Sequence, residues 1–207
     1  MSDRLRRGIG FNEMDDAERS ITDAVFELMQ TTDIPKMRVG DVIRMARVSR
    51  STFYRRFDSV DDVVKRFESA ILDSMRAIND IAIQARFTTA ELNATATMIN
   101  RMEVLLAHRD QVVALNGPHG DPTFNHKATV FMHDHLSERI SDVLGPSDEL
   151  ELYLAFMLAG HNNLVQFWLE KRPDIPPRKV AEALNRMFYA PFFLEGHQSQ
   201  MPNHLDL

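Results

Sequence analysis

The sequence has no cysteine, few glycines and no long apolar run. Without cysteine, the 207-residue chain has no disulfide, zinc–thiolate site or iron–sulfur cluster. Its 8 glycines do not cluster, so no glycine-rich loop is available to cradle phosphate. No stretch approaches the roughly 18 apolar residues of a membrane span, and residues 1–16 lack the apolar core of a secretion signal. These absences predict a cytoplasmic protein without a membrane segment.

Catalytic and metal-binding motifs are absent as well. The sequence lacks G-x-S-x-G and H-E-x-x-H, and a cysteine nucleophile is excluded. His133, Asp134 and His135 are consecutive, so their side chains would diverge around a helix instead of converging on one reacting atom. His126 and His133 lack the i, i+4 spacing of a helical zinc site. We therefore expect no enzymatic activity, no metal and no cofactor.

The net charge of −6 conceals one strongly basic segment. Residues 36–57 hold seven basic side chains and the single acid Asp41, a net charge of +6, so the rest of the chain sums to −12. A compact basic patch on an acidic body suits docking on phosphate, because the body repels unspecific contact. A solvated basic helix face would have the same composition, so the residue pattern of the segment has to decide between the two.

Apolar residues recur with helical spacing along the whole chain. Ile21, Ala24, Val25 and Leu28 fall at i, i+3, i+4 and i+7, one face of an α-helix. No segment alternates like a strand, and turn signals separate the helical stretches. The predicted fold class is all-α. Helices are predicted at about 15–31, 39–46, 49–57, 59–86, 89–108, 109–115, 122–144, 147–171 and 177–194.

The segment Val39–Phe57 is predicted to form two short helices around a tight turn at Arg47–Val48. Ser49 is a good N-cap for the second helix. That helix has polar and basic residues on one side and core aromatics on the other. This pattern is typical of a helix-turn-helix, in which the second helix enters the major groove of DNA.

Residues 18–67 resemble the DNA-binding domain of the TetR family of transcriptional regulators. In the first helix the family pattern is matched by Ile21, Asp23, Ala24, Glu27 and Leu28. It continues with Asp41, Val42, Ala46, Val48, Ser49, Thr52, Tyr54, Phe57, Ser59 and Asp62. Residues 89–207 match the family only in helix number and rough length.

The resemblance implies two domains. Residues 1–59 would be an N-terminal three-helix helix-turn-helix DNA-binding domain, and residues 60–207 a larger helical ligand-binding and dimerisation domain. A homodimer would bind a palindromic operator in double-stranded DNA as a ligand-responsive repressor. A transcriptional activator of the same fold is the first alternative, and a helical enzyme or an interaction protein that does not bind DNA is the more remote one.

The second helix of the motif supplies most of the predicted DNA contacts. Arg50 and Arg55 would pair with guanine, because an arginine fork matches O6 and N7 of that base, or would bind phosphate instead. By resemblance, Thr52, Tyr54 and Arg56 contact the DNA backbone. The predicted DNA-binding residues are Arg38, Arg47, Arg50, Ser51, Thr52, Tyr54, Arg55 and Arg56.

Several positions depart from the family pattern, among them Arg47, Ser51, Arg55, Arg56 and Val60. Arg47 stands where the family usually has glycine. If this turn needs a positive φ, a side chain there costs about 1 kcal/mol; a reshaped turn is the alternative. Val60 stands where the family often has a phosphate-contacting lysine, a loss that Arg56 would offset.

The helical body carries two further predictions. An unidentified small-molecule effector would bind in a pocket lined by adaptable apolar side chains and a histidine, although each of these would serve equally as plain core. The predicted pocket residues are Met98, Met102, Phe124, Phe131, Met157, His161 and Trp168. The last two helices would pair with their symmetry copies in a four-helix bundle, unless they only close the monomer core. The predicted dimer residues are Ala155, Ala159, Leu184, Met187 and Phe188.

Overall fold

The computed structural model describes residues 14–88, 92–144 and 147–189; at 79, 81–88, 92–95, 139–144 and 188–189 it describes the backbone alone. Every regular element in these ranges is a helix, which confirms the predicted all-α class. The elements are α2 (Asp16–Leu28), η2 (Ile34–Lys36), α3 (Val39–Ala46), α4 (Arg50–Tyr54), α5 (Val60–Thr88), α6 (Leu92–Ala107), α7 (Arg109–Leu115), α8 (Phe124–Leu144), α9 (Asp148–Lys171), α10 (Pro177–Leu184) and η3 (Asn185–Tyr189).

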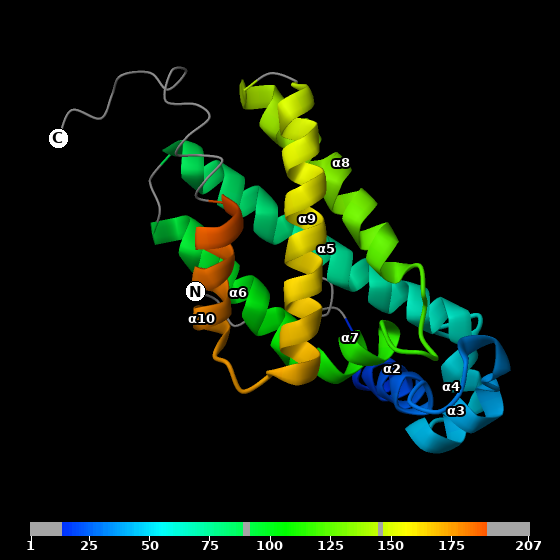
Figure 1. Cartoon of the computed structure of the whole chain (residues 1–207). Coiled ribbons are helices and arrows are strands. Elements are labelled where there is room, and N and C mark those ends of the chain that lie inside the picture. The colour runs from blue at the N-terminus through cyan, green and yellow to red at the C-terminus, as the bar shows by residue number, and fades with distance from the viewer. Residues whose placement is uncertain (1–13, 89–91, 145–146, 190–207) are drawn as a thin grey trace, which may run out of the picture.

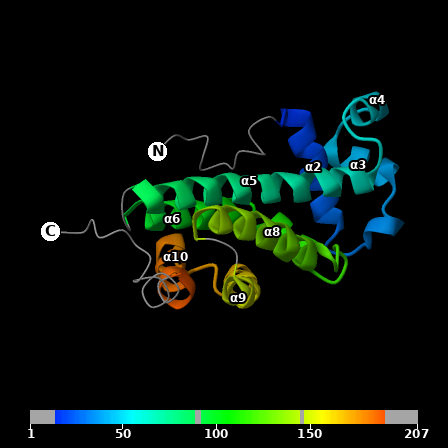
Figure 2. The ribbon, with the colours of Figure 1, turned by 90° about the horizontal axis from the view of Figure 1, so that it is seen from above.

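Helices α2, α3 and α4 gather at one end of the molecule, and α5 runs from this end along the body (Figures 1 and 2). A capping box starts α2, in which Asp15 accepts from the backbone of Glu18 and Glu18 accepts from the backbone of Asp15. The predicted apolar face of α2 is buried, with Ile21 and Val25 both 0 % exposed. Its packing against α5 includes Phe26 and Phe67, whose ring centroids lie 4.4 Å apart.

The long helix α5 packs against both halves of the molecule. Its N-terminal half contacts α2, and its length contacts α6 and α8. The predicted Ser59 cap is present, because the Asp62 backbone N–H donates to Ser59 Oγ at 3.1 Å. The reciprocal bond of the predicted capping box reaches one residue further back, from the Asp58 N–H to Asp62. The long helix α5 therefore connects the N-terminal helices α2, α3 and α4 to the body of the molecule.

In the body, α6 packs between α5 and α10, and α9 packs along α8 (Figure 2). The turn from α9 to α10 is held by the indole N–H of Trp168, which donates to the Ile175 carbonyl at 2.9 Å. Arg109 at the start of α7 donates to the Leu169 carbonyl at 2.7 Å. These bonds hold the C-terminal end of α9 against the start of α7 and against the turn that precedes α10.

Several helix ends differ from the prediction; the first helix, for example, ends at Leu28 and not at about Thr31. The helix that begins after Ser49 ends at Tyr54 and not at Phe57, because the Arg56 N–H bonds the Phe53 carbonyl three residues back and tightens the chain into a turn. The final helix passes into a π-helix at Asn185–Tyr189. Residues 190–194 of that prediction lie outside the described residues.

Candidate DNA-binding surface and effector site

The turn between α3 and α4 has a left-handed residue at its centre. Arg47 has φ 55° and ψ 39°, and it is the sole non-glycine residue with positive φ in the described part of the chain. Of the two predicted alternatives, the structure shows the positive φ and not a reshaped turn. The Val48 N–H closes the turn on the Ile43 carbonyl at 3.1 Å. The turn is thus a left-handed helix cap built with arginine in the place that glycine favours.

The first turn of α4 is fixed by the predicted cap. Ser49 Oγ accepts from the Thr52 N–H at 3.0 Å, and it also lies 2.8 Å from the hydroxyls of both Ser51 and Thr52. On the inner face, Phe53 and Phe57 are 0 % and 2 % exposed. The cap and these two rings hold α4 so that its opposite face points to solvent.

That outer face presents basic and polar side chains. Arg50, Ser51, Tyr54 and Arg55 are exposed, and the Arg50 guanidinium lies 5.7 Å from the centre of the Tyr54 ring. A cation over an aromatic face is attracted to it, so Tyr54 steadies Arg50 on the surface.

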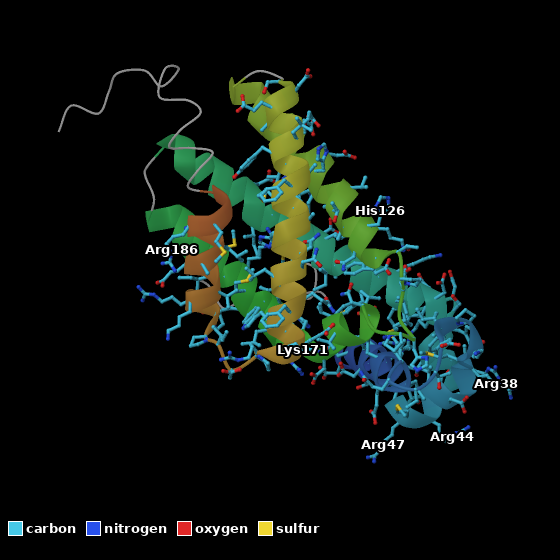
Figure 3. The ribbon with its side chains drawn as sticks, in the orientation of Figure 1. Arg38, Arg44, Arg47, His126, Lys171 and Arg186 are labelled. Carbon is cyan, nitrogen blue, oxygen red and sulfur yellow. The ribbon has the colours of Figure 1, made fainter. Side chains whose placement is uncertain are left out.

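Exposed arginines also project from α3 and its two ends. Arg38, Arg44 and Arg47 point outward at the same end of the molecule (Figure 3). Arg44 pairs with Asp41 at 3.0 Å, whereas Arg38, Arg47 and Arg55 have no ion pair with any residue that the structure describes. The charge of these three is therefore available to a partner.

Arg56 is placed differently from the other predicted DNA contacts. Its side chain is 15 % exposed and forms an ion pair with Asp15, the N-cap of α2. Its Nε lies 3.0 Å from both oxygens of that carboxylate, and its Nη1 donates to the Thr52 carbonyl at 3.3 Å. The hydrogen bond from Arg56 lowers the pKa of Asp15 to about 2. This geometry does not support the predicted phosphate contact, because the guanidinium already ties the end of α4 to the start of α2.

Two of the predicted effector residues, Trp168 and Phe131, make contacts that contribute to the fold. Trp168 is held in the α9–α10 turn by its bond to Ile175. Phe131 on α8 is half-buried and has the Arg76 guanidinium of α5 5.9 Å from its ring centre. These contacts give both residues a role in holding helices together. Phe124, at the start of α8, is 4 % exposed.

The remaining pocket residues lie on two helices. Met98 and Met102 share a face of α6, Met157 and His161 share a face of α9, and all four are buried. Sequence reasoning missed Arg101, which is 4 % exposed on the same helix as the methionines. In the sequence, Arg101 is a basic residue inside the apolar helical stripe formed by Met98, Met102 and Leu105.

The predicted dimer residues also divide. Ala155 and Ala159 are exposed on α9, next to Leu152 and Phe156, which are 73 % and 71 % exposed. Leu184 was predicted at the interface, but it is 0 % exposed because α10 packs it against α6 in the same monomer. That assignment is corrected to monomer core.

The two remaining residues of the predicted dimer interface are Met187 and Phe188. Met187 is 59 % exposed, and the Phe188 side chain lies outside the described residues.

Among the helices that the structure describes, none has the length and apolar character needed to cross a membrane.

The C-terminal half of the chain matches a family of known proteins. Residues 93–190 match the family model TetR_C_8, described as "Transcriptional regulator C-terminal region". No curated protein sequence matches the chain.

Two solved structures have a similar fold. The protein titled "Dihydroxyacetone kinase operon activator DhaS" has a TM-score of 0.58 and 16 % identity, over 84 % of this chain and 95 % of its own. A TetR transcriptional regulator from Streptococcus agalactiae 2603V has a TM-score of 0.51 and 19 % identity, over 83 % of this chain and 93 % of its own. At these identities the likeness concerns the fold.

Proposed function

Because this chain belongs to the TetR family of transcriptional regulators, we propose that it binds a palindromic operator as a homodimer and that a small-molecule effector controls this binding. The DNA-binding unit would be residues 1–59, and residues 60–207 would bind the effector and dimerise. Repression is the proposed outcome. Activation is the second candidate, since one protein of similar fold is itself named an operon activator.

The proposal rests above all on the exposed outer face of α4. Arg50 and Arg55 stand at opposite ends of this short helix, and buried aromatics hold it from behind. We propose that both arginines contact base edges, since a forked guanidinium matches guanine O6 and N7. Arg38, Arg47, Ser51 and Tyr54 would bind phosphates around them, and Thr52 would do so with the hydroxyl that already bonds Ser49.

The dimer is proposed to form through α9. Leu152, Phe156 and Phe167 are each more than half exposed on this helix, and Ala155 and Ala159 between them would let a second helix approach closely. Met187 would extend this face. A two-fold axis here would present two copies of α4 for successive major grooves, about 34–36 Å apart.

The effector would bind among α6 and α9 and select a conformation in which the two α4 helices are wrongly spaced for the operator. Such a protein acts where its DNA is, so we place it in the cytoplasm, and we propose no catalytic activity for it.

Titration of labelled DNA with the protein tests the proposed function. The DNA from directly upstream of its own gene and a scrambled duplex of equal length would be compared by fluorescence anisotropy over a salt series. We expect tighter binding to the upstream DNA, with affinity for both duplexes falling as salt rises. Equal affinity for the two duplexes at every salt concentration would contradict sequence-specific regulation.

Arg50→Ala extends this test to the proposed base contact. Loss of a guanine fork costs about 1–3 kcal/mol of discrimination, so the preference for operator over scrambled DNA should fall roughly 5- to 150-fold. Arg44→Ala is the matched control, because Arg44 is equally exposed but already paired with Asp41. Equal weakening on both duplexes by Arg50→Ala would assign Arg50 to phosphate.

A further inference from the structure

The turn between α7 and α8 reaches from the body of the molecule to the helix-turn-helix. His119 in this turn has its Nδ1 atom 2.6 Å from Oδ1 of Asp33, a residue 86 positions earlier in the chain. Asp33 stands directly before η2, the short helix that leads into α3. In both ribbon views the turn lies beside the connection between α2 and α3 (Figures 1 and 2). One side chain of the body thus bonds the segment that precedes the helix-turn-helix.

The bond between these two side chains involves a charged acceptor. Hydrogen bonds from Lys36, and then from His119, lower the pKa of the Asp33 carboxyl group. Asp33 is therefore ionised at neutral pH, and because an ionised carboxylate can only accept, the Nδ1 atom of His119 carries the proton and donates it. Charge-assisted bonds are stronger than neutral ones and hold a defined direction. The two side chains are 35 % and 38 % exposed, so the bond can break without opening the core.

The turn that presents His119 has little freedom to change its shape. The Asp121 N–H donates to the Leu115 carbonyl at 2.9 Å and closes the turn on the end of α7. A Cβ atom added at Gly120 would lie 2.0 Å from the same carbonyl oxygen, so a side chain does not fit there unless the turn moves. The backbone on either side of His119 is therefore held in place.

The turn is also anchored before and after His119. Before it, Gln111 on α7 donates to Asp23 on α2 at 3.0 Å. After it, Lys127 on α8 bonds both Asp121 and Glu68, and Glu68 belongs to α5. The position of the His119 side chain is thus set by three helices of the body.

The packing of α2 on α5 restrains the DNA-binding end in a different way. It includes the rings of Phe26 and Phe67. Apolar contact is non-directional, so it holds two parts together but defines the angle between them less sharply than a hydrogen bond does. The bond from His119 to Asp33 is suited to define that angle, because it is directional and joins an anchored turn to the segment before α3.

Resting on the dimer and the operator proposed above, we propose that His119 is a positioning residue whose bond to Asp33 fixes the angle of the helix-turn-helix against the body. In a dimer this angle sets the distance between the two copies of α4. It therefore sets which spacing between operator half-sites the protein accepts. His119 touches no DNA in this role and acts through Asp33.

Distances within one chain test the proposed angle without DNA. Because the chain has no cysteine, Arg44→Cys on α3 and Arg178→Cys on α10 give two exposed sites for spin labels on the full-length protein. Pulsed electron paramagnetic resonance, with excess unlabelled protein present, then reports the distance between the two labels of one chain. We expect a narrow distribution with His119 present and a broader or shifted one in His119→Leu. An unchanged distribution in His119→Leu would overturn the proposal.

Two further variants control the distance measurement. His119→Asn keeps an N–H donor near the place of Nδ1, so it should retain the narrow distribution. His126→Leu makes the same change at an exposed histidine on α8 that has no ion pair with any described residue (Figure 3). It should also leave the distribution unchanged. Equal broadening by His119→Leu and His126→Leu would contradict a specific role of His119.

The spacing of the operator tests the consequence for DNA binding. The site footprinted in the DNA upstream of the gene would be compared with the same duplex carrying one extra base pair at its centre, which moves the half-sites apart by about 3.4 Å. We expect the wild type to lose at least about tenfold in affinity on the longer duplex, and His119→Leu to lose about threefold or less. His119→Asn and His126→Leu should behave as the wild type does. A merely destabilised protein would bind both duplexes less and keep their ratio, so a wild-type ratio in His119→Leu would overturn the proposal.

Asp33→Leu breaks the same bond from its other side. Lys36→Leu is its control, because it removes only the other partner of Asp33. Asp33→Leu should relax the spacing preference and Lys36→Leu should keep it, and equal preferences in the two would contradict the proposal. These two variants decide if His119→Leu does not fold, as judged by circular dichroism. The double variant of His119→Leu with Asp33→Leu should relax the preference no further than either single change, since both remove one bond.

The positioning role and the proposed function fail in different ways. Operator recognition that persists with an unchanged distance distribution and spacing preference in His119→Leu would refute the positioning role and leave DNA regulation standing. A protein that does not distinguish operator from scrambled DNA would refute the regulatory function. The distance measurement would then still decide whether His119 fixes the angle of the helix-turn-helix.

Discussion

At the scale of single residues, Arg47 is expected to lower the stability of the fold and to raise the affinity for DNA. Its left-handed backbone costs about 1 kcal/mol relative to glycine, and its side chain is exposed beside α4. Arg47→Gly should therefore raise the free energy of unfolding by about 1 kcal/mol, as measured by urea denaturation. The same substitution should weaken binding to operator and scrambled DNA alike, because it removes the proposed phosphate contact of Arg47.

Arg47→Lys is the control for this prediction, because it keeps both the charge and the unfavourable backbone. Its stability and its affinity should stay close to those of the wild type. An Arg47→Gly variant that is no more stable than the wild type would mean that contacts of the arginine compensate the backbone strain.

The Asp15–Arg56 pair predicts a pH dependence of stability. The pKa of Asp15 is lowered to about 2 in the folded protein, from an ordinary value of 3.8. A lowered carboxyl pKa stabilises the fold above the unfolded pKa, and this contribution is lost as pH falls from about 4 towards 2. Asp15→Asn keeps an N-cap of equal quality and removes the charge. The stability gap between wild type and Asp15→Asn should therefore narrow as pH falls from 6 to 3.

Asp16→Asn provides the comparison, since Asp16 stands in the same helical turn with its side chain in solvent. Urea unfolding of the three proteins across this pH range is the measurement. A gap between wild type and Asp15→Asn that does not change with pH would show that the ion pair contributes nothing to stability.

At the scale of elements, Lys127 joins α5 to α8. Its ammonium lies 3.1 Å from Glu68 on α5 and also bonds Asp121 just before α8. Glu68 is 6 % exposed, and burial raises the pKa of its carboxyl group. Lys127→Met would leave this buried carboxyl without its cationic partner, which should cost about 2 kcal/mol of unfolding free energy.

Lys65→Met is the matched control on α5. Lys65 pairs with Asp61 four residues earlier, and both side chains are mostly exposed. Exposed pairs contribute little, so the melting temperature should hardly change. Equal destabilisation by both substitutions would show that burial of Glu68 is not what makes the Lys127 pair important.

The elements also show what local sequence rules can predict. The bounds of α3 and the Ser49 cap follow from neighbours within a few residues, and both were predicted correctly. The pairing of Arg56 with Asp15 joins residues 41 positions apart, and that of Lys127 with Glu68 joins residues 59 positions apart. No local periodicity encodes such contacts. Leu184 shows the same limit, because an apolar helical stripe fits a monomer core and a dimer interface equally well.

At the scale of the whole molecule, the proposed dimer depends on the exposed face of α9. Phe156 is 71 % exposed in the monomer, and an aromatic side chain of this kind is stabilised by burial against a partner. Phe156→Glu should therefore shift the protein from dimer to monomer in sedimentation experiments at micromolar concentration, without lowering its helix content. Operator affinity should fall strongly, because one subunit reads only half of the palindrome.

Met45→Glu is the control for the dimer prediction, since Met45 is a partly exposed apolar residue on α3, at the opposite end of the molecule from the upper part of α9 (Figure 1). This variant should remain a dimer. A wild-type protein that sediments as a single 23.8 kDa species would remove the dimer altogether. Each α4 would then bind a half-site independently, and affinity for a palindrome would no longer depend on the spacing between its halves.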